Sequence, residues 1–155
     1  MKKIKKYNFI IVLTLMLVLL TGCGSKNVTL SLEEILSTVY QDLPEEERPM
    51  MLQNVEVTAE NIEYYLGTSD IEYESALASE SGVGSIAHSV VLVRVKDNAN
   101  VEEIKTKIKE NVDPRKWICV GVEEEDIIVK SKGNLIILIM TSTGKETLEK
   151  GFDNL

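Results

Sequence analysis

The chain has a single histidine, His88, and three serines close to it in sequence could act as nucleophiles: Ser81, Ser85 and Ser89. A serine nucleophile needs a base that is held within hydrogen-bond reach in a defined geometry. None of the three serines lies in a G-x-S-x-G motif, which places a catalytic serine on a sharp turn. The sequence therefore favours His88 as an ordinary residue at the beginning of a strand.

Two carboxylate runs could bind a hard cation, Glu45–Glu47 and residues 123–126 (EEED). Calcium prefers carboxylate and carbonyl oxygens, and the loop that wraps around it has the spacing D-x-D-x-D-G. Neither run has this spacing, so both are interpreted as solvated acidic turns. Cation binding by residues 123–126 stays open at this stage.

Gly82 and Gly84 resemble part of a phosphate-binding loop, but a third glycine and a Lys-Ser/Thr pair are missing. The pair also lies between two expected strands, where no helix N-terminus is offered, so we interpret it as a hairpin loop. Cys119 lies near Trp117 and could be a reactive thiol. Because residues 117–122 contain no basic side chain to lower its pKa, we expect Cys119 to be buried as a small apolar residue.

Aromatic residues make up 5% of the chain, so we expect most of them to be needed for the core. Those that could instead line a ligand groove are Tyr64, Tyr65, Tyr73 and Trp117. The residues therefore present no catalytic constellation, no cofactor motif and no metal-ligand set. We expect a protein that is not an enzyme and needs no cofactor.

The N-terminus has three parts that are typical of an export signal: lysines within residues 2–6, the apolar segment 9–20 (FIIVLTLMLVLL), and Leu-Thr-Gly-Cys ending at Cys23. A membrane-spanning helix needs about 20 apolar residues, and this segment has 12. The positive end stays in the cytoplasm, which places the rest of the chain outside.

This arrangement resembles the lipobox of bacterial lipoproteins, in which the cysteine sulfur receives a diacylglyceryl group before cleavage. The resemblance implies that residues 1–22 are a signal peptide, that Cys23 is lipidated, and that residues 23–30 are a tether to the outer face of the cell membrane. The alternatives are an uncleaved anchor and an ordinary secretory signal with a chance cysteine. Two acyl chains give a stable anchor.

The part of the chain from Cys23 onward carries 13 of the 17 basic residues and all 25 acidic residues, a net charge of −12. Such a domain repels phosphate backbones, so we expect no binding to nucleic acid. With Cys23 lipidated, Cys119 has no partner for an internal disulfide, and the fold must depend on its core.

Residues 31–155 are expected to form one α+β domain. Ser31 and Glu34 form a capping-box pattern before a helix that ends at Pro44. An irregular connection is expected over 44–57, then a short helix capped by Thr58 and ended by Gly67. A strand over 71–78 and a loop over 79–85 follow.

The second half of the domain is expected to begin with a strand over 88–96 and a helix over 101–112. Residues 117–122 are either a loop or a short strand. Strands over 127–132 and 135–141 form a hairpin turned at Gly133-Asn134, and the uniformly apolar 135–140 predicts a strand covered on both faces. A second capping-box pattern, Thr143 to Glu146, opens the terminal helix. The order α-α-β-β-α-β-β-α predicts helices packed on a mainly antiparallel four-stranded sheet built from two hairpins.

Four stretches between residues 32 and 152 are similar to a family of small lipoproteins of low-GC Gram-positive bacteria, catalogued as domain of unknown function 4358. The stretches are 63–67 (EYYLG), 91–97 (VLVRVKD), 101–104 (VEEI) and 129–135 (VKSKGNL). Residues 113–125 depart from the long helix and loop of that family. The resemblance implies a lipoprotein and assigns no activity.

These observations favour a membrane-anchored, non-enzymatic binding or accessory module of the cell envelope, whose partner would be another envelope protein or a peptidoglycan-associated one. The alternative is a cell-wall hydrolase or transferase, which needs paired carboxylates or a Cys-His couple in one cleft. A solute-binding lipoprotein is disfavoured, because the 133 residues after position 22 are too few for two lobes around a ligand.

Overall fold

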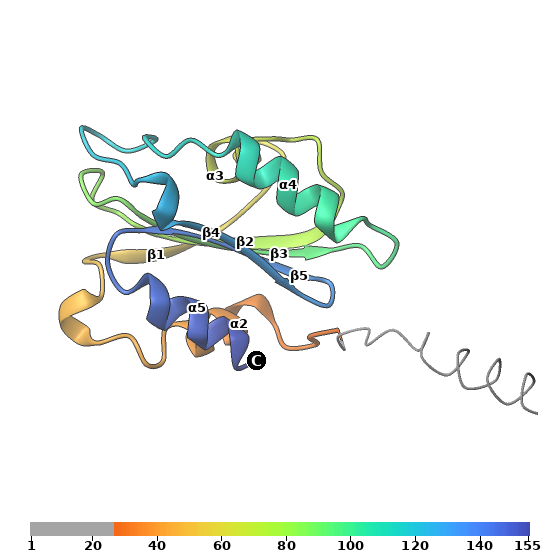
Figure 1. Ribbon diagram of the computed structural model, residues 1–155, viewed down its shortest axis with the longest axis horizontal. Helices are drawn as coiled ribbons and strands as arrows, with labels where there is room; N and C mark the ends of the chain where they lie inside the picture. Colours follow the sequence, from red (N-terminus) through yellow and green to blue (C-terminus); the bar gives the residue numbers. More distant parts are fainter. Residues whose placement is uncertain (1–26) are drawn as a thin grey trace, which may run out of the picture.

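A five-stranded sheet lies between two pairs of helices in the computed structural model, which describes residues 27–155 (Figure 1). Helices α2 (Leu32–Val39) and α5 (Lys145–Asp153) cover one face, and α3 (Ile62–Leu66) and α4 (Val101–Asn111) cover the other. The prediction of an α+β fold is confirmed. The expected signal peptide, residues 1–22, and the expected lipidation site Cys23 lie outside the described residues.

The strands are all antiparallel to their neighbours, in the order β1-β2-β3-β5-β4. Their bounds are β1 Leu52–Glu56, β2 Tyr73–Ser81, β3 His88–Val95, β4 Ile127–Lys132 and β5 Leu135–Thr141. Both expected hairpins, β2–β3 and β4–β5, are present, and they join through β3 and β5. The predicted count of four strands is wrong, because β1 adds a fifth.

Strand β1 lies inside the segment 44–57 that was expected to be irregular. Its two apolar residues, Leu52 and Val55, are three positions apart and pack into the cores on opposite faces of the sheet. No period of two therefore shows among its apolar residues. The strand forms because its backbone pairs with β2, from Leu52 opposite Ser81 to Glu56 opposite Leu77.

Strand β5 supplies both cores, as its uniformly apolar sequence predicted. All side chains from Leu135 to Met140 are fully buried. Ile136, Leu138 and Met140 pack with α3 and α4. The alternate residues of β5 pack with α2 and α5. A strand covered on both faces needs no polar side.

Strand β2 does not alternate regularly between the two faces of the sheet. A register shift between Tyr73 and Ser75 places Tyr73 in the same core as Ala76 and Ala78, while Leu77 faces the other core. A bulge of this kind inserts a residue and reverses the alternation beyond it. The strand also continues to Ser81, so the loop expected from residue 79 begins later.

The capping predictions had mixed outcomes. Ser31 and Glu34 form the expected capping box at α2, and Gly67 ends α3 at φ +72°. The cap expected at Thr58 is wrong, since α3 begins after Asn61, and Thr58 belongs to the preceding turn. The second capping box is also wrong, because Gly144 in the left-handed conformation is the N-cap of α5 and offers no side chain.

The sheet has two ends that matter for function. The chain enters at the end where β3 finishes, because the Arg94 guanidinium donates to the carbonyls of Val28 and Leu30, at 3.3 and 2.5 Å. We call this the proximal end. Residues 27–30, the part of the expected tether that the structure describes, are held there. The opposite, distal end gathers the 3-10 helices η1 (Glu45–Glu47) and η2 (Glu124–Asp126) with loops 82–87 and 113–123 (Figure 1). The eight residues of β3 separate the two ends by about 23 Å.

Candidate functional site

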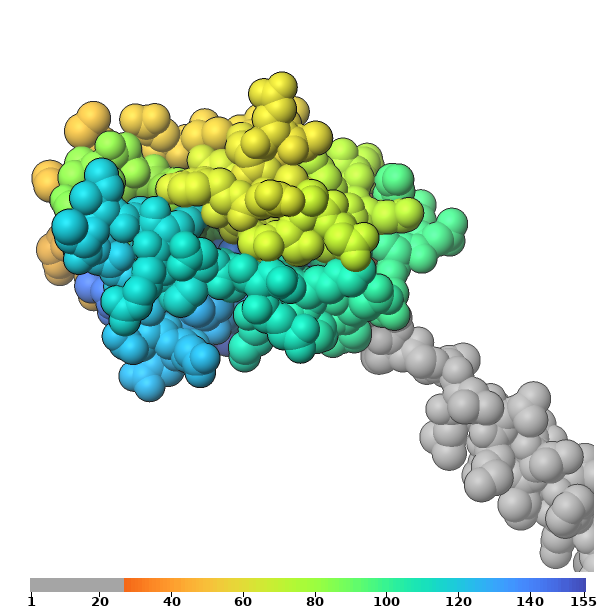
Figure 2. Space-filling view, turned by 90° about the horizontal axis from the view of Figure 1, so that it is seen from above, coloured from red at the N-terminus to blue at the C-terminus, as the bar shows by residue number. Residues whose placement is uncertain are grey.

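Three large apolar side chains are exposed at the distal end of the sheet. Met50 is 67% exposed, Met51 65% and Ile118 70%, more than any other large apolar residue in the described part of the chain. We call these three residues the distal patch. The segments that carry them gather at the end of the molecule away from residue 27, as orange, green and cyan atoms in Figure 2. Exposed apolar groups that cluster indicate a surface for interaction.

The β2–β3 loop joins the members of the distal patch. On one side, the Ser81 hydroxyl donates to the Met50 carbonyl at 2.8 Å, and the Gly82 N–H donates to the Met51 carbonyl at 2.9 Å. On the other side, the Ile118 N–H donates to the Gly84 carbonyl at 2.8 Å. Segments far apart in sequence are thereby fixed beside one loop.

Backbone strain coincides with the distal patch. Met51, at φ +54°, and Cys119, at φ +62°, are the two residues other than glycine with a positive φ in the described range 27–155. A side chain in this conformation costs roughly 1–2 kcal/mol. Such strain persists where the surrounding structure enforces it, and it is concentrated at functional sites.

A buried ion pair fixes the loop that displays Ile118. The Lys116 ammonium lies 3.0 Å from Glu80 Oε1, with side chains that are 3% and 10% exposed. The Trp117 Nε1–H and the Tyr64 hydroxyl donate to the same oxygen, at 3.0 and 3.3 Å. Three donors on one carboxylate oxygen, supplied by α3 and the loop, hold residues 113–122 against β2.

Aromatic rings surround the Lys116 ammonium, with centroids 4.4 Å away for Tyr64, 4.8 Å for Tyr65 and 5.2 Å for Trp117. Such rings attract a cation through their electron-rich faces. Burial lowers the pKa of Lys116, and the Glu80 carboxylate opposes that shift. Burial and the nearby Glu80 charge raise the pKa of Tyr64 to about 12. The expectation that aromatics serve the core holds for Tyr65 and Trp117, which are buried, while Tyr64 is 46% exposed.

A groove of about 460 Å³ opens beside the distal patch, between η1 and the loop that precedes η2. Glu46, Glu47 and Met50 line one side, and Val120 and Gly121 line the other. Its remaining lining comes from Arg48, Pro49, Ser85, Ile86, Ala87, His88, Thr141, Ser142 and Thr143. The groove extends the distal patch into a concave surface.

His88 lies behind this groove and is almost fully buried, at the first position of β3 as expected. Its Nε2 is 2.6 Å from the Tyr40 hydroxyl, and its Nδ1 is 3.0 Å from Thr141 Oγ1. Because Thr141 Oγ1 donates to the Thr143 carbonyl at 3.1 Å, it can accept from Nδ1–H, and Nε2 then accepts from Tyr40. Burial lowers the pKa of His88 to about 4, so the ring is neutral at pH 7.

The structure does not bring His88 to a serine. The Ser89 hydroxyl points to the other side of the sheet and accepts from the Lys116 ammonium at 3.2 Å. The Ser81 hydroxyl donates to the Met50 carbonyl, and Ser85 lies on the groove wall. Both ring nitrogens of His88 are occupied by hydroxyl groups, so its arrangement is that of a satisfied core histidine.

The two acidic runs lie at the same end of the sheet, in η1 and at η2, as short helical turns on the surface. Asp126 pairs with Lys145 at 2.5 Å, and Glu45 pairs with Arg48 at 3.6 Å. Among residues 27–155, no group of three or more His, Cys, Asp or Glu side chains is arranged to hold a metal ion.

The prediction of a buried Cys119 is wrong. Trp117 is directed into the core, whereas Ile118 and Cys119 are both exposed. The loop interpretation of Gly82 and Gly84 is confirmed, since both lie between β2 and β3. Residues 117–122 form a loop and no strand.

Neither the Glu80–Lys116 pair nor the distal patch could be predicted from the sequence. Glu80 is one of many exposed-looking acidic residues, and Lys116 precedes the only tryptophan of the chain, which is the single hint that it is buried. Met50 and Met51 are adjacent in the sequence, but their position at the same end as Ile118 depends on the loop between β2 and β3.

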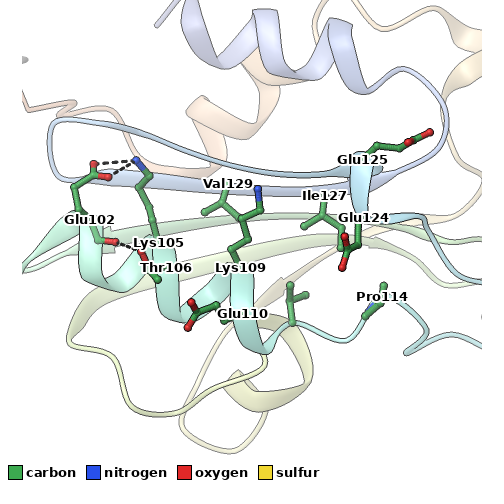
Figure 3. A pocket seen from close by; sticks show the side chains of 11 residues that line it. Glu102, Lys105, Thr106, Lys109, Glu110, Pro114, Glu124, Glu125, Ile127 and Val129 are labelled. Carbon is green, nitrogen blue, oxygen red and sulfur yellow. Dashed lines mark hydrogen bonds and ion pairs between the residues drawn. The ribbon is translucent and has the colours of Figure 1, made fainter.

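A larger hollow of about 830 Å³ lies between α4 and the edge strand β4 (Figure 3). Its floor includes Val129 and Ile127, and Lys105 is bound to Glu102 at its rim. Figure 3 shows Glu124 and Glu125 at its far end, well away from Glu102. The hollow brings together neither paired catalytic carboxylates nor a nucleophile with a base.

Comparison of the chain with protein-family models, with curated proteins and with solved structures gave no match. Within residues 27–155, no helix is long and apolar enough to cross a membrane.

Proposed function

We propose that this chain is a lipoprotein, anchored through Cys23 to the outer face of the cell membrane, that acts as a non-enzymatic docking module for another envelope protein. The proposal includes membership in the family of domain of unknown function 4358. Its partner would bind at the distal end of the sheet.

The observation that carries the proposal is the distal patch. Met50, Met51 and Ile118 are exposed together on a strained, well-anchored frame, at the end of the sheet opposite the point where the chain enters. A lipid on Cys23 would hold the proximal end near the bilayer and direct the distal patch away from it. Binding energy at protein interfaces comes from a few clustered apolar anchors, and this cluster has that character.

The alternative, a cell-wall hydrolase or transferase, has no comparable support. It needs a Cys-His couple or paired carboxylates in one cleft. His88 is buried with hydroxyl partners, and the exposed Cys119 is not among them.

Photo-crosslinking in living cells tests the proposal. In one variant of the full-length protein, a photoreactive amino acid replaces Ile118. In a second variant, the same amino acid replaces Leu30, which is 45% exposed at the proximal end. We expect one envelope protein to be captured from position 118 and not from position 30. Substitution of Met50 and Met51 by serine should reduce that capture at least tenfold at an equal level of lipidated protein. Equal capture from both positions, or none from position 118, would overturn the docking function.

A further inference from the structure

We infer that the distal patch binds a basic amphipathic helix, with apolar side chains on one face and lysine or arginine beside them. This inference rests on the proposed docking function and names the chemistry of its partner. Three features carry it: the acidic surroundings of the distal patch, the side chains that form it, and the state of the backbone beneath it.

The acidic surroundings come from both carboxylate runs. Glu45–Glu47 form η1 on one side of the groove, and Glu123, Glu124 and Glu125 are exposed where the other side continues into η2. The sheet therefore brings two runs that are distant in sequence to the end that carries the distal patch, where Glu124 and Glu125 line the hollow between α4 and β4.

Four basic side chains lie at this end, and each offsets at most one carboxylate; one of them, Arg115, is exposed in the loop 113–123. Arg48 pairs with Glu45 at 3.6 Å, and its guanidinium also donates to the Tyr40 carbonyl at 3.0 Å. Lys145 is committed to Asp126. Lys116 is buried against Glu80. The distal end thus presents an excess of negative charge, which attracts a cationic partner and repels an anionic bilayer.

The side chains of the patch suit a helix. Methionine is unbranched and polarisable, so the Met50-Met51 pair can adapt to apolar residues at i, i+3, i+4 and i+7 of a partner. The groove of about 460 Å³ beside them can receive one large side chain of that face.

The backbone beneath the patch disfavours the addition of a β-strand. The carbonyls of Met50, Met51 and Gly84 already accept hydrogen bonds, and the N–H groups of Gly82 and Ile118 already donate. A partner strand needs a row of unpaired backbone groups, which a sheet offers along its edge and not at the ends of its strands. Recognition at the distal end must therefore come from side chains.

The test uses the full-length lipoprotein in nanodiscs of zwitterionic lipid and three synthetic 18-residue peptides. One carries leucines at helical spacing on one face and lysines on the other; the second has glutamate for every lysine; the third is the first with its order scrambled. We expect the basic amphipathic peptide to bind at least tenfold more tightly than the other two, with empty nanodiscs as the blank.

Two variants separate the apolar and charged contributions. Met50→Ser/Met51→Ser should lower the affinity for the basic peptide at least tenfold at every salt concentration. Glu123→Lys/Glu124→Lys/Glu125→Lys should lower the affinity for the basic peptide at low salt and raise the affinity for the glutamate peptide. The matched control, Glu56→Lys/Glu60→Lys/Glu74→Lys, makes the same change in net charge at exposed positions away from the patch and should bind as wild type does.

Equal binding of the three peptides, or equal loss in the charge variant and its control, would overturn the inference. The docking function is decided separately by crosslinking at position 118. A captured segment that is neutral or acidic would leave docking intact and refute the basic helix. A captured lipid would refute both.

Discussion

The Lys116 ammonium and the Glu80 carboxylate meet 3.0 Å apart in a site from which water is largely excluded. Lys116 belongs to the loop that displays Ile118, and Glu80 belongs to β2, beside the loop that supports Met51. One buried pair therefore links the two halves of the distal patch. Its cost in desolvation is offset by the hydrogen bonds that Trp117 and Tyr64 donate to Glu80.

Lys116→Met should destabilise the domain by about 3–5 kcal/mol, because it leaves the Glu80 carboxylate buried without its cation. Urea unfolding of the full-length protein measures the change. The control is Lys107→Met, which breaks exposed pairs with Asp70 and Glu103 and should cost much less, because solvent screens them. Adding Glu80→Gln to Lys116→Met should recover part of the loss. Equal costs for Lys116→Met and Lys107→Met would show that the buried pair contributes no more than a surface one.

Elements with strong local patterns could be predicted from the sequence. Strand β5 is apolar at every core position, and α4 repeats apolar residues at helical spacing, so each element indicates its own structure. Strand β1 could not be predicted, because it is stabilised by pairing with β2 and its own residues carry no period of two. An element can be predicted from its own sequence when its own residues form a continuous buried apolar face.

The candidate site was less predictable for the same reason. Met51 and Ile118 are placed beside the same loop, residues 82–84, only through backbone hydrogen bonds. The burial expected for Cys119 followed the average behaviour of cysteine, whereas the inward turn of Trp117 directs the next two residues to the surface. A site made by loops from different strands depends on the sheet that aligns them.

His88 should make the domain sensitive to mild acid. Burial lowers the pKa of His88 from 6.5 to about 4, so between these values the unfolded chain binds a proton that the folded chain does not. Stability is therefore complete above pH 6.5 and falls as the pH decreases toward 4, by about 3 kcal/mol from this group. Urea unfolding at pH 7 and pH 4 measures it.

The control for this prediction is His88→Gln, which keeps a donor and an acceptor but does not titrate in this range. The carboxylates titrate in both proteins, so the difference between wild type and His88→Gln isolates the histidine. A loss between pH 7 and pH 4 that is the same in both proteins would mean that His88 is readily protonated in the folded state.

Cys23→Ala should abolish lipidation, because the thiol that accepts the diacylglyceryl group is gone. Metabolic labelling with a radioactive fatty acid, followed by fractionation, should show an unlabelled protein that is either an uncleaved precursor or released from the membrane. Cys119→Ser serves as the control and should keep wild-type labelling. Labelling of Cys23→Ala at the wild-type level would refute the lipoprotein proposal.

Met51→Gly should raise stability while it weakens binding. Met51 has φ +54°, a conformation that glycine adopts without strain, and its side chain is largely exposed, so replacement loses little packing. We expect the free energy of unfolding, measured in urea, to rise by about 0.5–1 kcal/mol. Relief of strain in the folded state stabilises the variant, and the greater freedom of glycine in the unfolded chain offsets part of that gain. Crosslinking from position 118 should fall several-fold, because an apolar anchor is lost.

The neighbouring Met50 provides the matched comparison, since it is equally exposed and its φ is not positive. Met50→Gly removes the same side chain but relieves no strain, so it should lower stability by about 0.5–1 kcal/mol and weaken crosslinking to a similar extent. If Met51→Gly raises stability, Met50→Gly lowers it, and both reduce crosslinking, then the backbone of Met51 is strained and its side chain contributes to binding. A loss of stability in both variants would mean that Met51 is not strained, and binding unchanged in both would remove the methionine pair from the interface.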